Sequence, residues 1–138
     1  MDKTEIMDFL KATPVCFLAT TEGNKPHVRA LGVYRADENG IILQSGKVKD
    51  LHKQLVANPE VEICFCDAKN FMQVRVSGRI EIVEDLALKK EIIDTRPQLK
   101  PIVERVGYDL ISVYRLKNGK ATAWSMKEPL APKAYVDL

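Results

Sequence analysis

Four polar side chains within residues 26–59 have the types and the spacing of an anion-binding site. Arg29 lies on a predicted strand. Ser45, Lys47 and Lys49 follow in a predicted loop at the start of a helix. Anions such as phosphate bind to donors of these types: a guanidinium group, a hydroxyl, ammonium groups and the free N–H groups at the start of a helix. A solvated basic loop on an ordinary β-barrel would have the same composition, and the spacing alone does not exclude it.

The sequence contains none of the motifs that mark a self-sufficient catalytic site. It has no glycine-rich dinucleotide or Walker loop, no nucleophile elbow and no His-Glu-x-x-His pair. Its acids and bases are scattered, and no pair has a spacing that requires general acid–base catalysis. An enzyme with this sequence would need a cofactor to carry the difficult chemical step. The basic cluster is the place where the phosphate of such a cofactor would bind.

The three cysteines indicate neither a disulfide framework nor a metal centre. Their odd number does not fit a set of disulfide pairs. Cys64 and Cys66 would share one face of a strand, because side chains alternate along it. A zinc site would need more ligands, and the only histidines are His27 and His52. We therefore expect Cys16, Cys64 and Cys66 to be buried, apolar thiols.

Length and composition favour a single domain over residues 1–138, with residues 126–138 as a loosely docked C-terminal arm. Hydrophobic residues make up 46% of the chain and charged residues 29%, which are globular values. The net charge of +2, without a long basic run, argues against nucleic acid as a partner. The apolar runs are too short for a membrane span, and the acidic N-terminus does not resemble a secretory signal. We expect a cytoplasmic protein without a membrane partner.

The elements that would position the basic cluster begin with a helix and a β-hairpin. Residues 2–5 have the spacing of a capping box, which predicts a helix that ends near Thr13-Pro14. Residues 15–21 predict a central strand and residues 26–35 a second strand, joined by a turn. Gly32 within the second strand indicates a bulge or the close approach of another backbone or ligand.

The middle of the chain alternates between short strands and one helix. A short strand at residues 41–43 precedes the basic loop, and strands at residues 61–66 and 71–84 follow the helix. The helix ends at Asn58-Pro59. Its inner face is expected to consist of Val48, Leu51, Leu55 and Val56.

The last part of the chain predicts two helical pieces and a closing hairpin. Asp85 is expected to cap a helix through Ile93, and a second helical piece covers residues 98–106. Asn118-Gly119, between two β-rich runs, is the strongest short hairpin signal in the chain. Together these elements predict a mainly β fold, in which six or seven antiparallel strands close into a barrel with helical insertions.

Four motifs follow one another along almost the whole chain. They are FLAT with VRALG at residues 17–32, LQSGKVKDLHKQLVANPEVEIC at residues 43–64, QVRVSGRIEIV at residues 73–83 and LKNGKATAWSM at residues 116–126. In this order and spacing they resemble the pyridoxamine 5′-phosphate oxidase-like family, in particular its short members. The resemblance implies an antiparallel split β-barrel that binds FMN and forms a homodimer, with two flavins at the interface.

The resemblance also implies a set of flavin-site residues, carried over by position. They are Arg29, Ala30, Leu31, Ser45, Lys47, Lys49 and Gln73. Arg29 and its neighbours would line the flavin and its phosphate, while Ser45 and Lys49 would hold the phosphate. Lys47 lies in the same loop, and the sequence does not decide which lysine makes the main contact. Gln73 would reach the flavin from the partner chain.

The roles of three of the candidate residues can be interpreted in more than one way. Arg29 could instead pair with a carboxylate such as Glu62 on a neighbouring strand. His27 could be a solvent-facing turn residue, or it could contact the flavin or a substrate. Trp124 belongs to the candidate flavin site as an aromatic residue near the ring, but its alternating strand also suits a core or a dimer interface.

The chain departs from true pyridoxamine phosphate oxidases at its end. Those enzymes have a C-terminal Arg-x-His segment that binds the substrate phosphate, whereas this chain ends in PLAPKAYVDL. We therefore expect an FMN-dependent oxidoreductase of this class that acts on an unidentified small molecule and has no metal site. The alternatives are a non-catalytic flavin-binding or flavin-sensing module, or a binder of a related cofactor such as a deazaflavin. The sequence does not identify catalytic residues.

Overall fold

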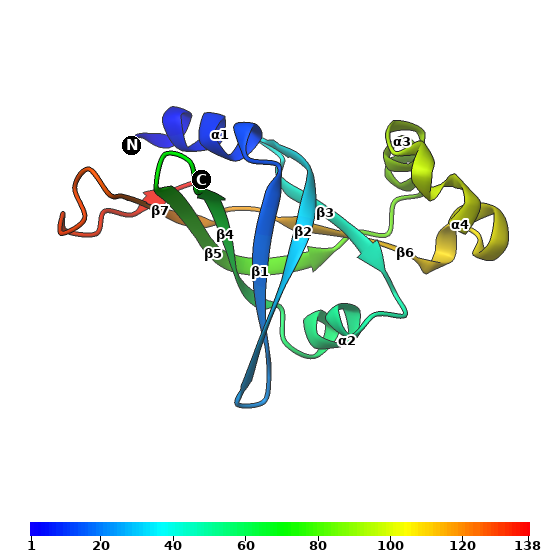
Figure 1. Cartoon of the computed structure of the whole chain (residues 1–138). Coiled ribbons are helices and arrows are strands. Elements are labelled where there is room, and N and C mark those ends of the chain that lie inside the picture. Colours follow the sequence, from blue (N-terminus) through cyan, green and yellow to red (C-terminus); the bar gives the residue numbers. More distant parts are fainter.

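Six antiparallel strands close into a split β-barrel in the computed structural model, which describes residues 1–138 (Figure 1). The whole sheet has eight strands, which are β1 (Val15–Glu22), β2 (Lys25–Asp37), β3 (Gly40–Gly46), β4 (Glu60–Asp67), β5 (Met72–Ile82), β6 (Ile111–Leu116), β7 (Lys120–Ser125) and β8 (Val136–Asp137). Around the barrel the order is β4, β1, β2, β3, β6 and β5, and β5 closes the ring by pairing with β4. β7 and β8 extend the sheet beyond β5. The predicted mainly β, antiparallel barrel is confirmed.

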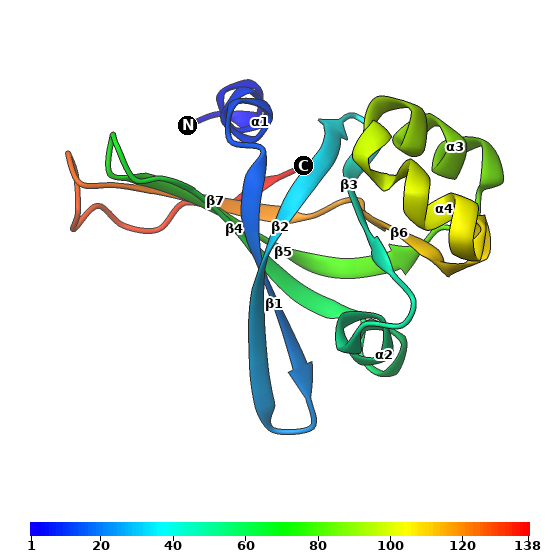
Figure 2. The same ribbon diagram turned by 45° about the vertical axis from the view of Figure 1, so that its right-hand side comes forward.

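The four α-helices pack at different places around this barrel (Figure 2). They are α1 (Lys3–Ala12), α2 (Asp50–Ala57), α3 (Leu86–Thr95) and α4 (Lys100–Val106), with 3₁₀ turns at Pro97–Leu99 and Tyr108–Leu110. Two predicted helix starts are confirmed: Asp2 forms a capping box with Glu5, and Asp85 accepts a hydrogen bond from the N–H of Leu88. None of the helices combines the length and the apolar composition needed to cross a membrane.

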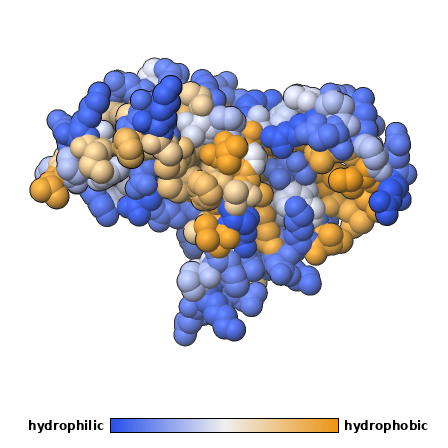
Figure 3. Space-filling view, in the orientation of Figure 1, coloured by the Kyte–Doolittle hydropathy of each residue, from blue (hydrophilic) through white to orange (hydrophobic).

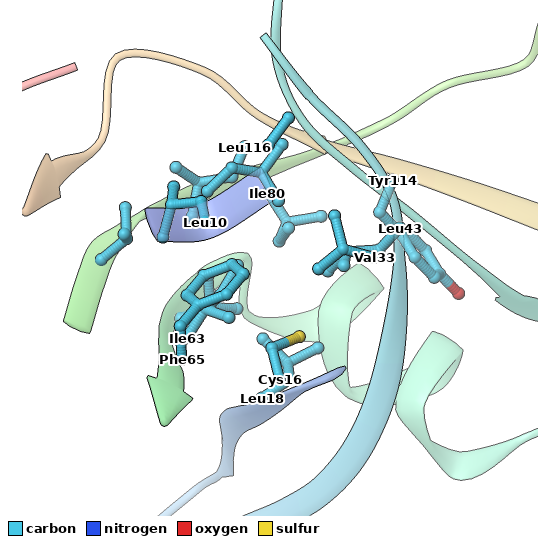
Figure 4. Close-up of a cluster of buried hydrophobic side chains, with 14 of the residues drawn as sticks. Leu10, Cys16, Leu18, Val33, Leu43, Ile63, Phe65, Ile80, Tyr114 and Leu116 are labelled. Atoms are coloured by element: carbon cyan, nitrogen blue, oxygen red, sulfur yellow. The ribbon is translucent and has the colours of Figure 1, made fainter. Parts of the chain in front are cut away.

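A single large hydrophobic core fills the barrel (Figure 4). The cluster contains 19 buried residues from the barrel strands, β7, α1 and α2. Leu18, Ile63, Phe65 and Tyr114 are fully buried in it, and Leu10 of α1 packs onto the same cluster. Burying one such side chain stabilises the fold by roughly 1.5–3 kcal/mol. The core therefore dominates stability, and polar residues at the barrel edge contribute much less.

β2 is the strand at which the barrel splits. Its first part pairs with β1, in a register that ends with Gly32 opposite Val15. Pairing with β3 begins only at Val33 and is irregular between Val33 and Arg35, just beyond the glycine where the sequence predicted a bulge. Residues 26–32 therefore have no strand partner on the β3 side. The β1–β2 hairpin projects from the barrel beside α2 (Figures 1 and 2).

Asn118 and Gly119 do not form the predicted hairpin turn. β6 and β7 do not pair with each other; β6 pairs with residues 80–82 of β5, and β7 pairs with residues 72–77. Asn118 has a φ of 57°, and the dipeptide forms a kink between the two strands. A two-stranded hairpin is marginal by itself, whereas β5, with 11 residues, offers a longer partner. Tertiary pairing therefore overrides the local turn signal.

The inner face of α2 also differs from the predicted one. Leu51 and Leu55 are buried as expected, but Val48 and Val56 are exposed. The helix begins at Asp50, so Val48 precedes it, and Gln54 takes the remaining inward position. Residues three and four apart share a helix face, which places Gln54 beside the two leucines.

Only one of the cysteines is the expected buried thiol. Cys16 lies in the core, and its burial, with a smaller contribution from Cys64, raises the pKa of its thiol to about 11. Cys64 is half-buried and Cys66 is exposed. The prediction of buried thiols is wrong for Cys66, because that face of β4 points away from the barrel and no element of the chain covers it.

Candidate functional site

The split in the barrel opens onto a cavity between β2, the end of β3 and the start of α2. Its volume is about 610 Å³. Most of the predicted flavin-site residues line it, namely Arg29, Ala30, Leu31, Ser45 and Lys49. These residues come from separate parts of the chain, and they meet because α2 packs against the β1–β2 hairpin.

Arg29 of β2 is held in place by residues of two other elements, β1 and α2. Its Nη1 donates to Thr20 Oγ1 at 2.7 Å and to the main-chain oxygen of Leu18 at 3.3 Å. Its Nη2 donates to Gln54 Oε1 at 2.6 Å. Thr20 Oγ1 also donates to Gln54 Oε1 at 2.6 Å, so the three side chains form a closed hydrogen-bonded ring. β1, β2 and α2 together fix the guanidinium group.

No carboxylate is in contact with the Arg29 guanidinium. Glu62, the partner considered from the sequence, instead pairs with Arg75 at 3.2 Å. Burial lowers the pKa of Arg29 from its usual value, and the charge of Asp50 acts in the opposite direction. Arginine nevertheless stays protonated in proteins. The cavity wall therefore carries a fixed positive charge whose hydrogen-bond partners are all neutral.

Ser45 is buried, and its hydroxyl has no hydrogen-bond partner. The residue is 4% exposed and lines the cavity. It lies in β3, opposite Ser112 of β6, and not in a loop as predicted. His27 Nε2 is a second buried, unpaired atom on the same cavity wall. Because buried polar groups are nearly always hydrogen-bonded, these atoms mark positions that a polar ligand would complete.

The start of α2 adds helical N–H groups to the same wall. Lys49 is the N-cap residue, and no side chain caps the helix start. The N–H groups of the first turn thus have no side-chain acceptor, and the positive end of the helix dipole lies at the cavity. Asp50 supplies one acidic residue in this turn. The combination of a basic N-cap and uncapped N–H groups suits an anion.

Lys47 is the predicted phosphate ligand that the structure does not bring to the cavity wall. Its Nζ lies 2.7 Å from Glu84 Oε1, and Glu84 Oε2 lies 3.0 Å from the Nζ of the buried Lys89. Hydrogen bonds from Lys47 and Lys89 lower the pKa of Glu84. Lys47 is therefore tied to the segment before α3, whereas Lys49 lines the cavity.

Gln73 and Trp124 lie on the outer face of the sheet, away from this cavity. They are opposite each other in the β5–β7 register and line a different cavity of about 370 Å³, together with Arg75 and Thr122. Trp124 is 38% exposed and its Nε1 donates to the main-chain oxygen of Pro129 at 3.2 Å, so it does not belong to the core. Within one chain, these two residues and Arg29 line separate cavities.

Thr20 and Gln54 are functional candidates that the sequence analysis missed. They are 1% and 4% exposed, and both hold Arg29. The available signal was the polar Gln54 among the apolar residues Leu51 and Leu55, at positions that share a helix face. No comparable signal marked Thr20, because threonine is common in strands.

Comparison with known families gives one match. The sequence profile described as pyridoxamine 5′-phosphate oxidase matches residues 2–121. A search of curated proteins found no significant match to the chain.

Several solved structures have a similar fold. A NimC/NimA family protein from Clostridium acetobutylicum is 27% identical, with a TM-score of 0.78 over 98% of this chain and 92% of that chain. A protein from the same organism, related to general stress protein 26, is 14% identical, with a TM-score of 0.77 over 98% and 93% of the two chains. A pyridoxamine 5′-phosphate oxidase-related, FMN binding protein from Nostoc punctiforme is 12% identical, with a TM-score of 0.66 over 99% and 96%. At these low identities, the similarity to the last two proteins shows a shared fold only.

Proposed function

This chain belongs to the pyridoxamine 5′-phosphate oxidase family, and on that premise we propose that it binds FMN in the cavity beside Arg29. The phosphate would bind Arg29, Ser45 and Lys49, and Ala30 and Leu31 would contact the flavin. When bound, FMN supplies the capacity to accept and donate electrons. The Nostoc protein of the same fold, described as FMN binding, agrees with this cofactor.

One observation carries the proposal. The Arg29 guanidinium, held only by neutral acceptors, lies on the same cavity wall as the unpaired, buried hydroxyl of Ser45. A phosphate would supply both the missing counter-charge and the missing hydrogen-bond acceptor. Buried polar groups are nearly always hydrogen-bonded, and buried charges are usually paired. A solvated basic loop would explain neither the uncharged partners of Arg29 nor the unpaired hydroxyl of Ser45.

We propose further that the protein is an FMN-dependent oxidoreductase for a small molecule. Its own residues would bind and orient the cofactor and exclude water from one side of it, while the redox chemistry belongs to the flavin.

An absorption spectrum of the purified protein tests the cofactor directly. We expect flavin bands that stay with the protein through gel filtration after it has been mixed with excess FMN and desalted. Reduction of these bands by a nicotinamide donor, followed by reoxidation in air, would support the oxidoreductase. Retained flavin that no donor reduces would instead indicate a flavin-binding module without turnover, and loss of all flavin on desalting would contradict FMN binding.

We also propose that the protein is a homodimer with two flavins at the interface. Gln73 and Trp124 line a cavity on the outer sheet face, so they would meet the flavin of a second copy. The outer face of β1 exposes the apolar residues Val15 and Phe17. Figure 3 shows apolar residues gathered across the middle of the molecule in this view, while the projecting hairpin below them is hydrophilic.

The expected assembly is a two-fold dimer that buries more than ~1,200 Å² in total, the lower range of stable, specific interfaces. Light scattering at micromolar concentration, on protein saturated with FMN, should therefore give twice the mass of the chain. Replacing Phe17 with glutamate, in the middle of the exposed apolar face, should shift the mass towards the monomer. A monomeric mass of the parent protein under these conditions would contradict the proposed interface.

A further inference from the structure

The Arg29 anchor is built from groups that hold the guanidinium without cancelling its charge. Both side-chain acceptors, Thr20 and Gln54, are neutral and nearly fully buried, and the third acceptor is the main-chain oxygen of Leu18. A glutamate at position 54 would have almost the same shape as glutamine and could accept the same bonds. It would also form an ion pair with Arg29 and neutralise it.

The anchor leaves part of the guanidinium free for a ligand. Of the five N–H donors of an arginine, three are used by Leu18, Thr20 and Gln54. Two N–H groups remain, which is the number that a bidentate contact with an oxyanion requires. Arg29 Nε makes no hydrogen bond and is not among the buried unpaired atoms, so it is not sealed off from a ligand, and Arg29 lines the cavity.

The same helix carries the anchor and the basic N-cap. Gln54 lies one turn after Lys49 and Asp50, which line the cavity at the start of α2. Its hydrogen bonds to Thr20 and Arg29 tie this helix to the β1–β2 hairpin. A ligand that bridges Arg29 and the start of α2 would thus find the guanidinium group and the helix already held together, which lowers the entropic cost of binding.

We propose that Gln54, with Thr20, is a positioning residue that orients Arg29 towards the phosphate of the ligand and, because it is uncharged, preserves the positive charge that binds this phosphate. The inference rests on the proposed FMN function and adds to it the residue that sets the selectivity for a phosphorylated flavin over an unphosphorylated one. A merely structural role for Gln54 would require only its hydrogen bonds, and a carboxylate at this position could provide them as well.

The decisive variant is Gln54→Glu. Its carboxylate can accept from Thr20 and Arg29, so we expect the thermal unfolding temperature to stay equal to that of the parent or to rise. Charge-assisted hydrogen bonds are about twice as strong as neutral ones, and pairing Arg29 with a carboxylate should weaken FMN binding about 10-fold. Riboflavin, which lacks the phosphate, should bind the variant and the parent equally well.

A second variant, Gln54→Met, removes the hydrogen bonds of Gln54 to Arg29 and Thr20 and adds no charge. We expect FMN to bind it less tightly than the parent, by a smaller factor than for Gln54→Glu, again with riboflavin unchanged. Both ligands are titrated against the parent and the two variants by flavin fluorescence, and circular dichroism establishes that each variant is folded.

The possible outcomes separate this inference from the function on which it rests. If the parent prefers FMN to riboflavin but Gln54→Glu binds FMN as tightly as the parent, the positioning role is wrong and the FMN proposal stands. Equal losses for FMN and riboflavin would likewise overturn the inference, because they indicate a structural defect. If the parent itself does not distinguish FMN from riboflavin, the phosphate site fails and the inference fails with it.

Discussion

Replacing Arg29 with alanine is expected to weaken FMN binding by about 10- to 150-fold and to leave riboflavin binding unchanged. Hydrogen bonds between a charged donor and a phosphate are worth roughly 1.5–3 kcal/mol, and each 1.4 kcal/mol corresponds to about a tenfold change in affinity. The factor is large because no other guanidinium lines the cavity. Isothermal titration or fluorescence quenching with both ligands measures it.

Two lysines, two positions apart, provide a matched control for this experiment. Lys49→Ala removes an ammonium group from the cavity wall and should also weaken FMN relative to riboflavin. Lys47→Ala removes a lysine that is already paired with Glu84, so FMN affinity should change little. Equal binding of FMN and riboflavin by the parent, or an equal loss in Lys47→Ala and Arg29→Ala, would show that the phosphate binds elsewhere.

The Arg29→Ala variant should remain folded, which makes the binding result interpretable. Arg29 is only part-buried, and the hydrogen bond between Thr20 and Gln54 does not depend on it. The core clusters around residues such as Leu18 and Phe65, which the substitution does not touch. Urea unfolding of the variant checks this point before any affinity is compared.

Local signals in the sequence were sufficient for most individual elements of the fold. The capping box at Asp2 and the cap at Asp85 depend on residues three positions apart, and both are confirmed. Asn118-Gly119 is also a local signal, but it failed, because the strands on either side pair with β5 and not with each other. A short window of sequence does not show which distant strands pair. Here the pairing of both strands with β5 determines the structure, and the turn propensity of Asn118-Gly119 does not.

In the candidate site, too, the sequence predicted some residues correctly as neighbours, but it did not predict contacts between residues far apart in the chain. The resemblance brought together Arg29, Ser45 and Lys49, and the structure places them on one cavity wall. The contacts of Arg29 with Thr20 and Gln54 were not predicted, since Thr20 and Gln54 lie 34 positions apart and meet only after folding. Lys47 has the same charge and almost the same position in the sequence as Lys49, yet its ion pair with Glu84 separates their roles. Only tertiary packing makes that distinction.

Replacing Gly40 with alanine is expected to lower the free energy of unfolding by about 2–6 kcal/mol, the largest effect on stability among the substitutions considered. Gly40 starts β3 with a φ of +108°, which residues with a side chain rarely adopt. A Cβ atom there would lie 2.6 Å from the main-chain oxygen of Leu116 in β6. Backbone strain costs about 1–3 kcal/mol and overpacking costs a similar amount. The main chain of Leu116 cannot move away from the added methyl group as easily as the end of a flexible side chain could.

Gly23→Ala is the matched control, because it shares the positive φ but not the close contact. Gly23 has a φ of +58° in the β1–β2 turn, and a Cβ atom there would meet nothing within 4 Å. The left-handed conformation alone costs about 1–2 kcal/mol, so its midpoint of urea denaturation should fall much less. FMN affinity per folded molecule should stay at the parent value in both variants, since neither glycine lines the cavity. Equal midpoints for the two variants would contradict the argument, because they would show that β3 and β6 separate at Gly40 without a measurable cost.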